Sequence, residues 1–237
     1  MTIDILPDDA LLDIFSFYLV DRSKHIEPWH TLVHVCQRWR SIVFASPRRL
    51  DVQVFYMLKR QVNAMLDIWP NLPIEISALR SEEMRARDIK NLVATLKHTD
   101  RICQIQLKDF SCFELEGILP AIEKSFPALT SLTIECYKHH LIRFQEVMVM
   151  SLPQTFLGRS AQHLWSCNLV HIDFPGIWKL LLTANHLVTL RLWDIPFSTH
   201  TSPDGMATLL SMMPNLESLS IGFLSPRSLH DWHDQSK

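Results

Sequence analysis

Leu187-Val188-Thr189-Leu190-Arg191-Leu192 carries the pattern that runs through most of this 237-residue chain, with apolar residues at the first, fourth and sixth of six positions. Alternate side chains of a β-strand point to opposite faces, so Leu190 and Leu192 share one face and Arg191 lies on the other. The pattern L-x-x-L-x-L, with isoleucine or cysteine in place of some leucines, begins at Ile102, Leu129, Leu164, Leu187 and Leu216. Leu72 begins an irregular earlier copy.

The spacing of these copies predicts a repeat architecture. They start 27, 35, 23 and 29 residues apart, close to the period of leucine-rich repeats, in which a helix or turn follows each short strand. One strand and one helix bury only a few leucines, each worth about 1.5–3 kcal/mol, whereas ordering costs about 1–2 kcal/mol per residue. Single units must therefore stack. We predict an α/β fold: a short, irregular leucine-rich-repeat solenoid with parallel strands on its concave face and helices or loops on its convex face.

Amphipathic stretches between the copies supply the predicted return helices. Their apolar faces are Ile89, Leu92, Val93 and Leu96; Leu115, Ile118, Leu119 and Ile122; Ile177, Leu180, Leu181 and Ala184; and Met206, Leu209, Leu210 and Met213. The link 141–161 is predicted to be a short helix plus loop. After Ile221 the chain is short and polar, whereas a solenoid needs a terminal cap. This segment either wraps over the last strand or marks an array truncated at its C-terminus, and we favour truncation.

The first fifty residues have a helical pattern instead. Leu6-Pro7-Asp8-Asp9 predicts a helix start, because proline needs no backbone donor there and acids suit the positive helix end. An apolar stripe follows: Leu11, Ile14, Phe15, Tyr18 and Leu19. A second helix is predicted from near Pro28 to Ser46-Pro47, with one face formed by Trp29, Leu32, Val35, Cys36, Trp39 and Val43. So short a segment cannot bury this much apolar surface alone, so the excess must meet the rest of the chain or a partner.

These N-terminal residues resemble the F-box motif. Its more specific elements are the Leu6-Pro7 opening and Val35-Cys36-Gln37-Arg38-Trp39-Arg40, which fits V-C-x-x-W-R. The rest of the pattern is Leu11/Leu12, Ile14-Phe15, Leu19, Leu32 and Val43. The loop between the helices is longer than in the compact form, as in the F-box-like variants common in fungal proteins. The stretches 126–132 and 180–196 look like the repeats of fungal F-box-like leucine-rich-repeat proteins, so the resemblance covers most of the chain.

The resemblance implies a three-helix module that docks on the small adaptor subunit of an SCF-type cullin–RING ubiquitin ligase and, through it, on a cullin. Carried over by position, the adaptor-facing residues are Leu6, Pro7, Leu11, Ile14 and Phe15, with some of Leu32, Val35, Cys36 and Trp39, the remainder forming the module's own core. The implied domains are an F-box-like helical module (1–50), a connecting segment (51–70) and a leucine-rich-repeat array (71–237).

The implied function is that of a substrate-recognition subunit, whose repeats hold a protein target while other subunits transfer ubiquitin. The alternative is a non-catalytic leucine-rich-repeat interaction or scaffold protein with no ubiquitin-ligase role, whose N-terminal helices only cap the array. If the repeat register is right, the positions between the leucines line the concave face. The candidate target-binding residues there are Gln104, Gln106, Ser131, Thr133, Thr189, Arg191 and Trp193. Trp193 is either an exposed interface residue or packed on the neighbouring unit.

Composition argues against several classes of function. With 23 basic and 25 acidic residues, the formal charge of −2 gives no reason to expect nucleic acid or an anionic membrane as a partner. The five cysteines are odd in number and none form C-x-x-C, which predicts a reducing compartment and no zinc knuckle. The acidic N-terminus does not resemble a signal peptide, and no apolar run approaches the length of a membrane span. We expect an intracellular protein, cytoplasmic or nuclear or both.

The sequence offers little chemistry. It lacks G-x-S-x-G, G-x-x-x-x-G-K-[ST], G-x-G-x-x-G and H-E-x-x-H. His139-His140 and the pair His230 and His233 lack further ligands nearby in sequence, so surface histidines are a better interpretation than a metal site. His34 and Cys36 point in different directions on a helix, which argues against a nucleophile and its base. We therefore predict no enzyme activity, no cofactor and no metal.

Overall fold

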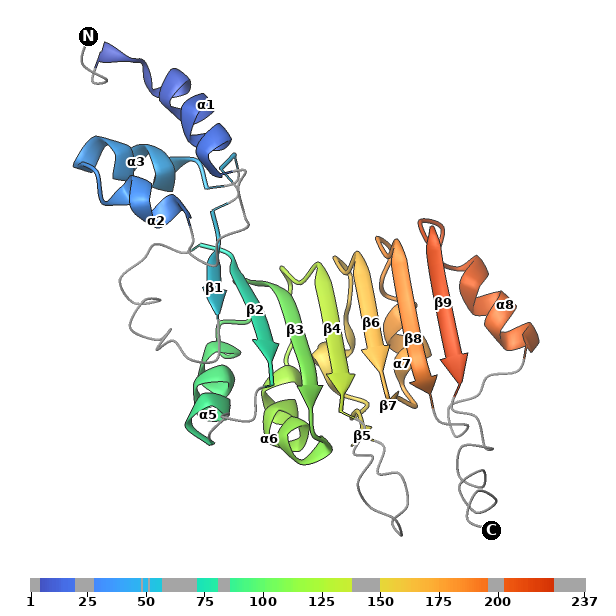
Figure 1. Ribbon diagram of the computed structural model, residues 1–237. Coiled ribbons are helices and arrows are strands. Elements are labelled where there is room, and N and C mark those ends of the chain that lie inside the picture. The colour runs from blue at the N-terminus through green and yellow to red at the C-terminus, as the bar shows by residue number, and fades with distance from the viewer. Residues whose placement is uncertain are drawn as a thin grey trace, which may run out of the picture.

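A seven-stranded parallel sheet dominates the fold (Figure 1). The computed structural model describes residues 5–19, 28–47, 49–50, 52–56, 72–80, 86–137, 150–195 and 203–223. The strands are β1 (Val54–Tyr56), β2 (Ile74–Leu79), β3 (Ile102–Phe110), β4 (Ser131–Cys136), β6 (Ser166–Val170), β8 (Thr189–Ile195) and β9 (Ser218–Phe223). Their spatial order follows the chain order, so the chain advances across the sheet in one direction. The protein is α/β, as predicted.

Helices connect most of the successive strands. They are α5 (Ala86–Thr95), α6 (Cys112–Ile122), α7 (Ile177–Leu181) and α8 (Pro203–Ser211), and they coincide with the four predicted amphipathic stretches. Connections between neighbouring parallel strands are right-handed, so these helices lie on one face of the sheet. We call the opposite face, whose side chains point away from the helices, the open face.

The register of the sheet aligns the predicted copies. One row across five neighbouring strands consists of Ile105, Leu132, Cys167, Leu190 and Leu219. The next row on the same face consists of Leu107, Ile134, Leu169, Leu192 and Ile221. The first four members of each row are buried against the helices. These two rows are the centre of the core, and the predicted strand register is confirmed.

A left-handed backbone residue recurs at the same place in three strands, two positions after the second row. These residues are Asp109 (φ 60°), His171 (φ 57°) and Asp194 (φ 55°). Aspartate and histidine tolerate this conformation better than β-branched residues do. The local change of direction turns the next apolar side chain back into the core: Phe110, Ile172 and Ile195 are buried.

Two stretches contain strands that the sequence pattern does not predict. The connecting segment 51–70 contains β1, which pairs with β2 at the edge of the sheet. In the link 141–161 the described part holds no α-helix. It contains β5 (Met150–Ser151), which pairs with β7 (Ile172–Asp173) in a separate two-stranded sheet, and the 3-10 helix Phe156–Arg159. Residues 138–149 and 224–237, and with them the four histidines weighed as metal ligands, lie outside the described residues.

The N-terminal part forms three short helices: α1 (Asp8–Leu19), α2 (Pro28–Val33) and α3 (Gln37–Ala45). The prediction of one continuous helix from Pro28 is wrong. The helix is interrupted at residues 34–36. Cys36 has an extended backbone there (φ −157°, ψ 169°) and precedes the first turn of α3. The buried residues between the helices are Leu11, Leu12, Phe15, Trp29, Leu32, Val33, Ile42 and Val43.

The three helices are joined to the sheet through the strand that begins it. Trp29 Nε1 donates a hydrogen bond to the backbone oxygen of Gln53 (2.9 Å), just before β1. The backbone N–H of Val52 donates to the oxygen of Pro47 (2.8 Å). Figure 1 shows α1, α2 and α3 near β1, beyond the N-terminal ends of the strands. The helices therefore cover the start of the sheet and share one apolar core with it.

The rows predict how much each leucine contributes to stability. Leu190 is 0% exposed between its neighbours, whereas Leu219, its register partner on the last strand, is 42% exposed. We expect Leu190→Ala to lower the free energy of unfolding by about 2–5 kcal/mol, because it leaves a cavity in the core. The matched variant Leu219→Ala should lower it by about 1 kcal/mol or less, since its side chain is already hydrated. Urea unfolding of both variants checks this, and equal losses would contradict the register.

A capping box fixes the start of α6. Ser111 Oγ accepts a hydrogen bond from the backbone N–H of Glu114 (3.3 Å), and the Ser111 N–H donates to Glu114 Oε2 (2.8 Å). Arg80 Nε, at the end of β2, donates to Glu114 Oε1 (3.1 Å). Burial acts to raise the pKa of Glu114, but the bonds from Ser111 and Arg80 outweigh it and hold the pKa below its usual value. The ionised carboxylate therefore stabilises the fold.

The lowered pKa of Glu114 makes its contribution depend on pH. Because the pKa is lower in the folded state, the stabilisation is present above the ordinary glutamate pKa of about 4.3 and is lost as the pH falls through the folded value. We expect Glu114→Gln to cost about 1 kcal/mol at pH 7, and the difference from the natural protein to shrink toward zero at low pH. Urea unfolding across this range measures it. The control, Glu116→Gln on the exposed side of α6, should cost about 0.5 kcal/mol or less.

Candidate functional site

The first helix has apolar residues on two sides. Leu11 and Phe15 are fully buried against α2 and α3, and the ring of Phe15 lies 4.7 Å from that of Trp39, between centroids. The opposite side exposes Ile14 (45%), Phe17 (80%) and Tyr18 (49%). A helix that only needed to cover the sheet would carry polar residues on this outer side.

The burial of α1 corrects part of the predicted adaptor-facing set. Leu11, Phe15 and, on α2, Leu32 are buried in the module's own core and do not face solvent. The predicted stripe treats Leu11, Ile14 and Phe15 as one face, but the centre of the buried face lies toward Leu12, which turns Ile14 outward. Leu6 and Trp39 are half-buried. Of the nine predicted residues, Pro7, Ile14, Val35 and Cys36 are exposed.

Arg38 joins the start of α1 to the start of α3. Its guanidinium donates to the backbone oxygen of Leu6 (2.5 Å) and to Asp8 Oδ1 (2.7 Å). Arg49, beyond the end of α3, forms a second ion pair with α1 through Asp13 (2.6 Å). These bonds bring the Leu6-Pro7 opening close to the turn that carries Val35 and Cys36.

The exposed apolar residues of the N-terminal helices are candidates for binding a partner, and we refer to them together as the module surface. Its members are Ile5, Pro7, Ile14, Phe17, Tyr18, Val35 and Cys36. The predicted partner-binding set does not include Phe17, which falls outside the stripe at Leu11, or Tyr18, which belongs to the stripe but was given no role. The signal that could have found them is that α1 has too many apolar positions for one face of a helix.

The open face of the sheet is a second candidate surface. Gln104, Ser131 and Thr189 lie in one row across it, and Gln106, Thr133 and Arg191 in the next. All of these are at least partly accessible. Polar contacts link several of the strands: Ser77 Oγ donates to Gln106 Oε1 (3.1 Å), and Asn168 Nδ2 donates to Glu135 Oε1 (3.1 Å). The predicted target-facing residues therefore share one face.

Trp193 is both packed and exposed, so each of the two interpretations of its environment is partly correct. Its indole N–H donates to Ser220 Oγ on β9 (2.8 Å), and its ring lies over Gly222, where an added Cβ would come within 3.1 Å of the ring. The Arg191 guanidinium lies 5.2 Å from the ring centroid. Even so, 41% of Trp193 remains exposed.

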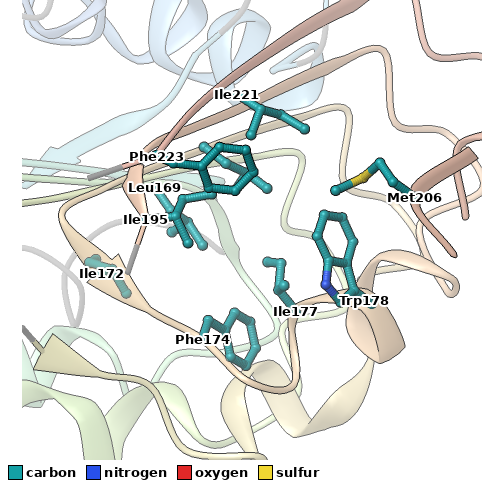
Figure 2. A pocket seen from close by; sticks show the side chains of 10 residues that line it. Leu169, Ile172, Phe174, Ile177, Trp178, Ile195, Met206, Ile221 and Phe223 are labelled. Carbon is teal, nitrogen blue, oxygen red and sulfur yellow. The ribbon is translucent and has the colours of Figure 1, made fainter. Parts of the chain in front are cut away.

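A small apolar pocket lies between the sheet and helices α7 and α8 (Figure 2). Leu169, Leu192 and Ile221 of the strands face Trp178 and Met206 across it. Its free volume is about 20 Å³, close to the space that one water molecule needs. The indole nitrogen of Trp178 is buried there, and no described residue forms a hydrogen bond with it. With so little space and almost no polar lining, the pocket is not suited to binding and transforming a substrate.

The described residues contain one close pair of thiols. Cys112 Sγ and Cys136 Sγ lie 3.2 Å apart, where α6 begins and β4 ends. Burial, followed by the hydrogen bond and charge interaction with Cys112, raises the pKa of Cys136 far above its usual value. This thiol is therefore protonated at neutral pH and is a poor nucleophile. In the described ranges, no three His, Cys, Asp or Glu side chains gather as a metal site would require.

Comparisons with protein-family models, curated proteins and solved structures gave no match for this chain. Among the described helices, none combines the length and the apolar character needed to cross a bilayer.

Proposed function

We propose that the chain is the substrate-recognition subunit of an SCF-type cullin–RING ubiquitin ligase. In this proposal the three N-terminal helices are an F-box-like module that docks on the small adaptor subunit, and through it on a cullin. The strands and helices that follow are an irregular leucine-rich-repeat array, which holds a protein target. The chain itself performs no chemistry, and the other subunits transfer ubiquitin.

The observation that carries the proposal is the exposed apolar module surface. Val35 and Cys36, which belong to the V-C-x-x-W-R motif, are exposed at the turn before α3, and Pro7 of the Leu-Pro opening is exposed before α1. Arg38, from the same motif, fixes these two segments relative to each other. Clusters of exposed apolar residues on a folded helical unit are typical of a protein-binding surface.

The repeat assignment is supported by features that recur from strand to strand. The leucine positions align in two buried rows, and the left-handed residues Asp109, His171 and Asp194 recur at one position after them. A sheet wound in chain order presents its open face as one extended surface, which suits binding to another protein. Holding a target there raises the effective concentration of its lysines near the conjugating enzyme, so orientation is the mechanism.

The alternative function, a scaffold protein with no ligase role, also has an observation in its favour. The N-terminal helices are bonded through Trp29 to the backbone of Gln53, just before the first strand, so they cover the N-terminal end of that strand. That capping role explains the inner side of α1. It does not explain the apolar outer side that includes Ile14 and Phe17.

A binding assay with the purified adaptor tests the proposal. We expect the natural chain to be retained on immobilised adaptor, and Ile14→Asp or Val35→Asp to weaken retention at least about tenfold, because each places a charge in an apolar interface. Both residues are exposed, so the folded structure should persist, which circular dichroism verifies. The matched control is Phe113→Asp on α6, where an equally drastic change is made to an exposed aromatic residue distant in sequence from the module.

Each outcome of this assay separates the two functions. Retention that survives Phe113→Asp but not Ile14→Asp or Val35→Asp supports docking through the module surface. If the natural chain is not retained at all, the ligase role is wrong and the scaffold function remains. Retention that none of the module variants weakens would place the adaptor on another surface.

A further inference from the structure

We propose that Arg191 and Trp193 form a subsite for an acidic segment of a protein target. A glutamate or aspartate carboxylate of the target pairs with the Arg191 guanidinium, and an adjacent apolar side chain packs on the exposed part of the Trp193 ring. This inference names the chemistry of the target and rests on the proposed function, in which the open face holds that target.

Arg191 differs from Lys108, another cation on the open face, in its charged neighbours. Lys108 Nζ lies 3.9 Å from Glu135 Oε1, and Glu135 also accepts a hydrogen bond from Asn168, so these charges are already compensated. Arg191 is exposed, and the described part of the chain gives it no carboxylate partner. The open face therefore offers a guanidinium that no described carboxylate engages, with donors suited to binding both oxygens of a carboxylate.

The ring of Trp193 is held in place before any target binds. Its N–H is bonded to Ser220, and one face of the ring lies over Gly222, where no side chain could fit without contacting it. A fixed aromatic side chain loses little conformational freedom on binding, so the contact it makes is not offset by an ordering cost. Tryptophan and arginine are also the residues most enriched at the energetic centres of protein interfaces.

Neighbouring hydroxyl groups complete the subsite. Ser220 Oγ accepts from the Trp193 indole, which leaves its own hydrogen available for a carboxylate. Ser220 is also the register partner of Arg191 on β9, so the two groups stand side by side on adjacent strands. Thr189 and Ser218 form the next pair of the same two strands. A ligand at Arg191 thus meets hydrogen-bond donors and no described acidic group directly opposite it.

The same balance of charge favours a carboxylate over a phosphate. Phosphorylated segments carry nearly two negative charges and are bound by clusters of arginines. On the described open face, Lys108 is engaged by Glu135, which leaves Arg191 to balance a single charge. We therefore assign the subsite to an unmodified acidic segment and make phosphoserine one arm of the test.

Immobilised peptide libraries test this assignment with the full chain. Nine-residue peptides are randomised except for a central pair, which is Glu-Leu, Gln-Leu, Lys-Leu or phosphoserine-Leu. We expect the natural chain to bind the Glu-Leu library about three- to tenfold better than the Gln-Leu library. Arg191→Glu should reverse the preference toward Lys-Leu. Trp193→Ala, or the milder Trp193→Phe if the first variant is unstable, should weaken binding of Glu-Leu peptides and reduce the benefit of the leucine.

The matched control is Arg87→Glu, which changes the same charge on the exposed surface of α5 and should keep the Glu-Leu preference. Equal binding of the Glu-Leu and Gln-Leu libraries, or a preference that Arg191→Glu does not alter, overturns the subsite. Stronger binding of phosphoserine-Leu than of Glu-Leu overturns the choice of a carboxylate. The adaptor is absent from this assay, so a failure here is distinguishable from a failure of adaptor docking, which is measured on the module variants.

Discussion

Apolar contact between successive strands is the interaction on which the rest of this structure depends. A strand such as β8 is seven residues long, and its helix α7 is five, so neither can bury a leucine without neighbours. Leu132, Cys167 and Leu190 are fully buried because each is flanked by its register partners and covered by the helix layer. Since the register fixes which side chains face inward, it also fixes which ones face outward. The polar open face, with Arg191 and Trp193 on it, is thus a consequence of how the leucines stack.

The N-terminal helices have a different physical role, which is to cover the beginning of the sheet. A sheet that advances in one direction has a first strand with one unpaired edge, and among the described strands β1 holds that place. Packing α1–α3 beyond the N-terminal end of β1 extends the apolar core past the beginning of the sheet. Covering the sheet requires only one apolar side of α1, yet Ile14, Phe17 and Tyr18 add a second one. This excess is the physical reason for proposing that the module binds another subunit.

Most of the fold could be predicted where burial imposes a period on the sequence. Strands β3, β4, β6, β8 and β9 and helices α5 to α8 follow from leucine spacing, because each of these elements has one buried side. β1 could not be predicted this way, since three residues are too short for a period to show. The left-handed residues at Asp109, His171 and Asp194 went unpredicted because those residue types also occur in ordinary loops. The capping box at Ser111 and Glu114 has a readable signature, S-x-x-E, and was overlooked.

The candidate sites could also be predicted only where burial imposes a clear period on the sequence. On the sheet, a period of two separates inward from outward positions without ambiguity, so the residues of the open face were assigned correctly to one surface. On α1 nearly every position from Leu11 to Leu19 is apolar, so the helical period does not say which side is inside. The resemblance to the F-box motif predicts that Leu11 and Phe15 face a partner, whereas both are buried and Phe15 packs on Trp39. A sequence that is apolar on both sides predicts an interface but not its orientation.

Hydrogen–deuterium exchange of the full chain, alone and with purified adaptor, tests the central claim most directly. The account predicts slower exchange on adding the adaptor in the segments that carry the module surface, residues 5–19 and 34–40, and unchanged exchange in strands β3 to β9. No change in either segment, or protection confined to the sheet, would contradict the claim that the outer side of the N-terminal helices is the docking surface.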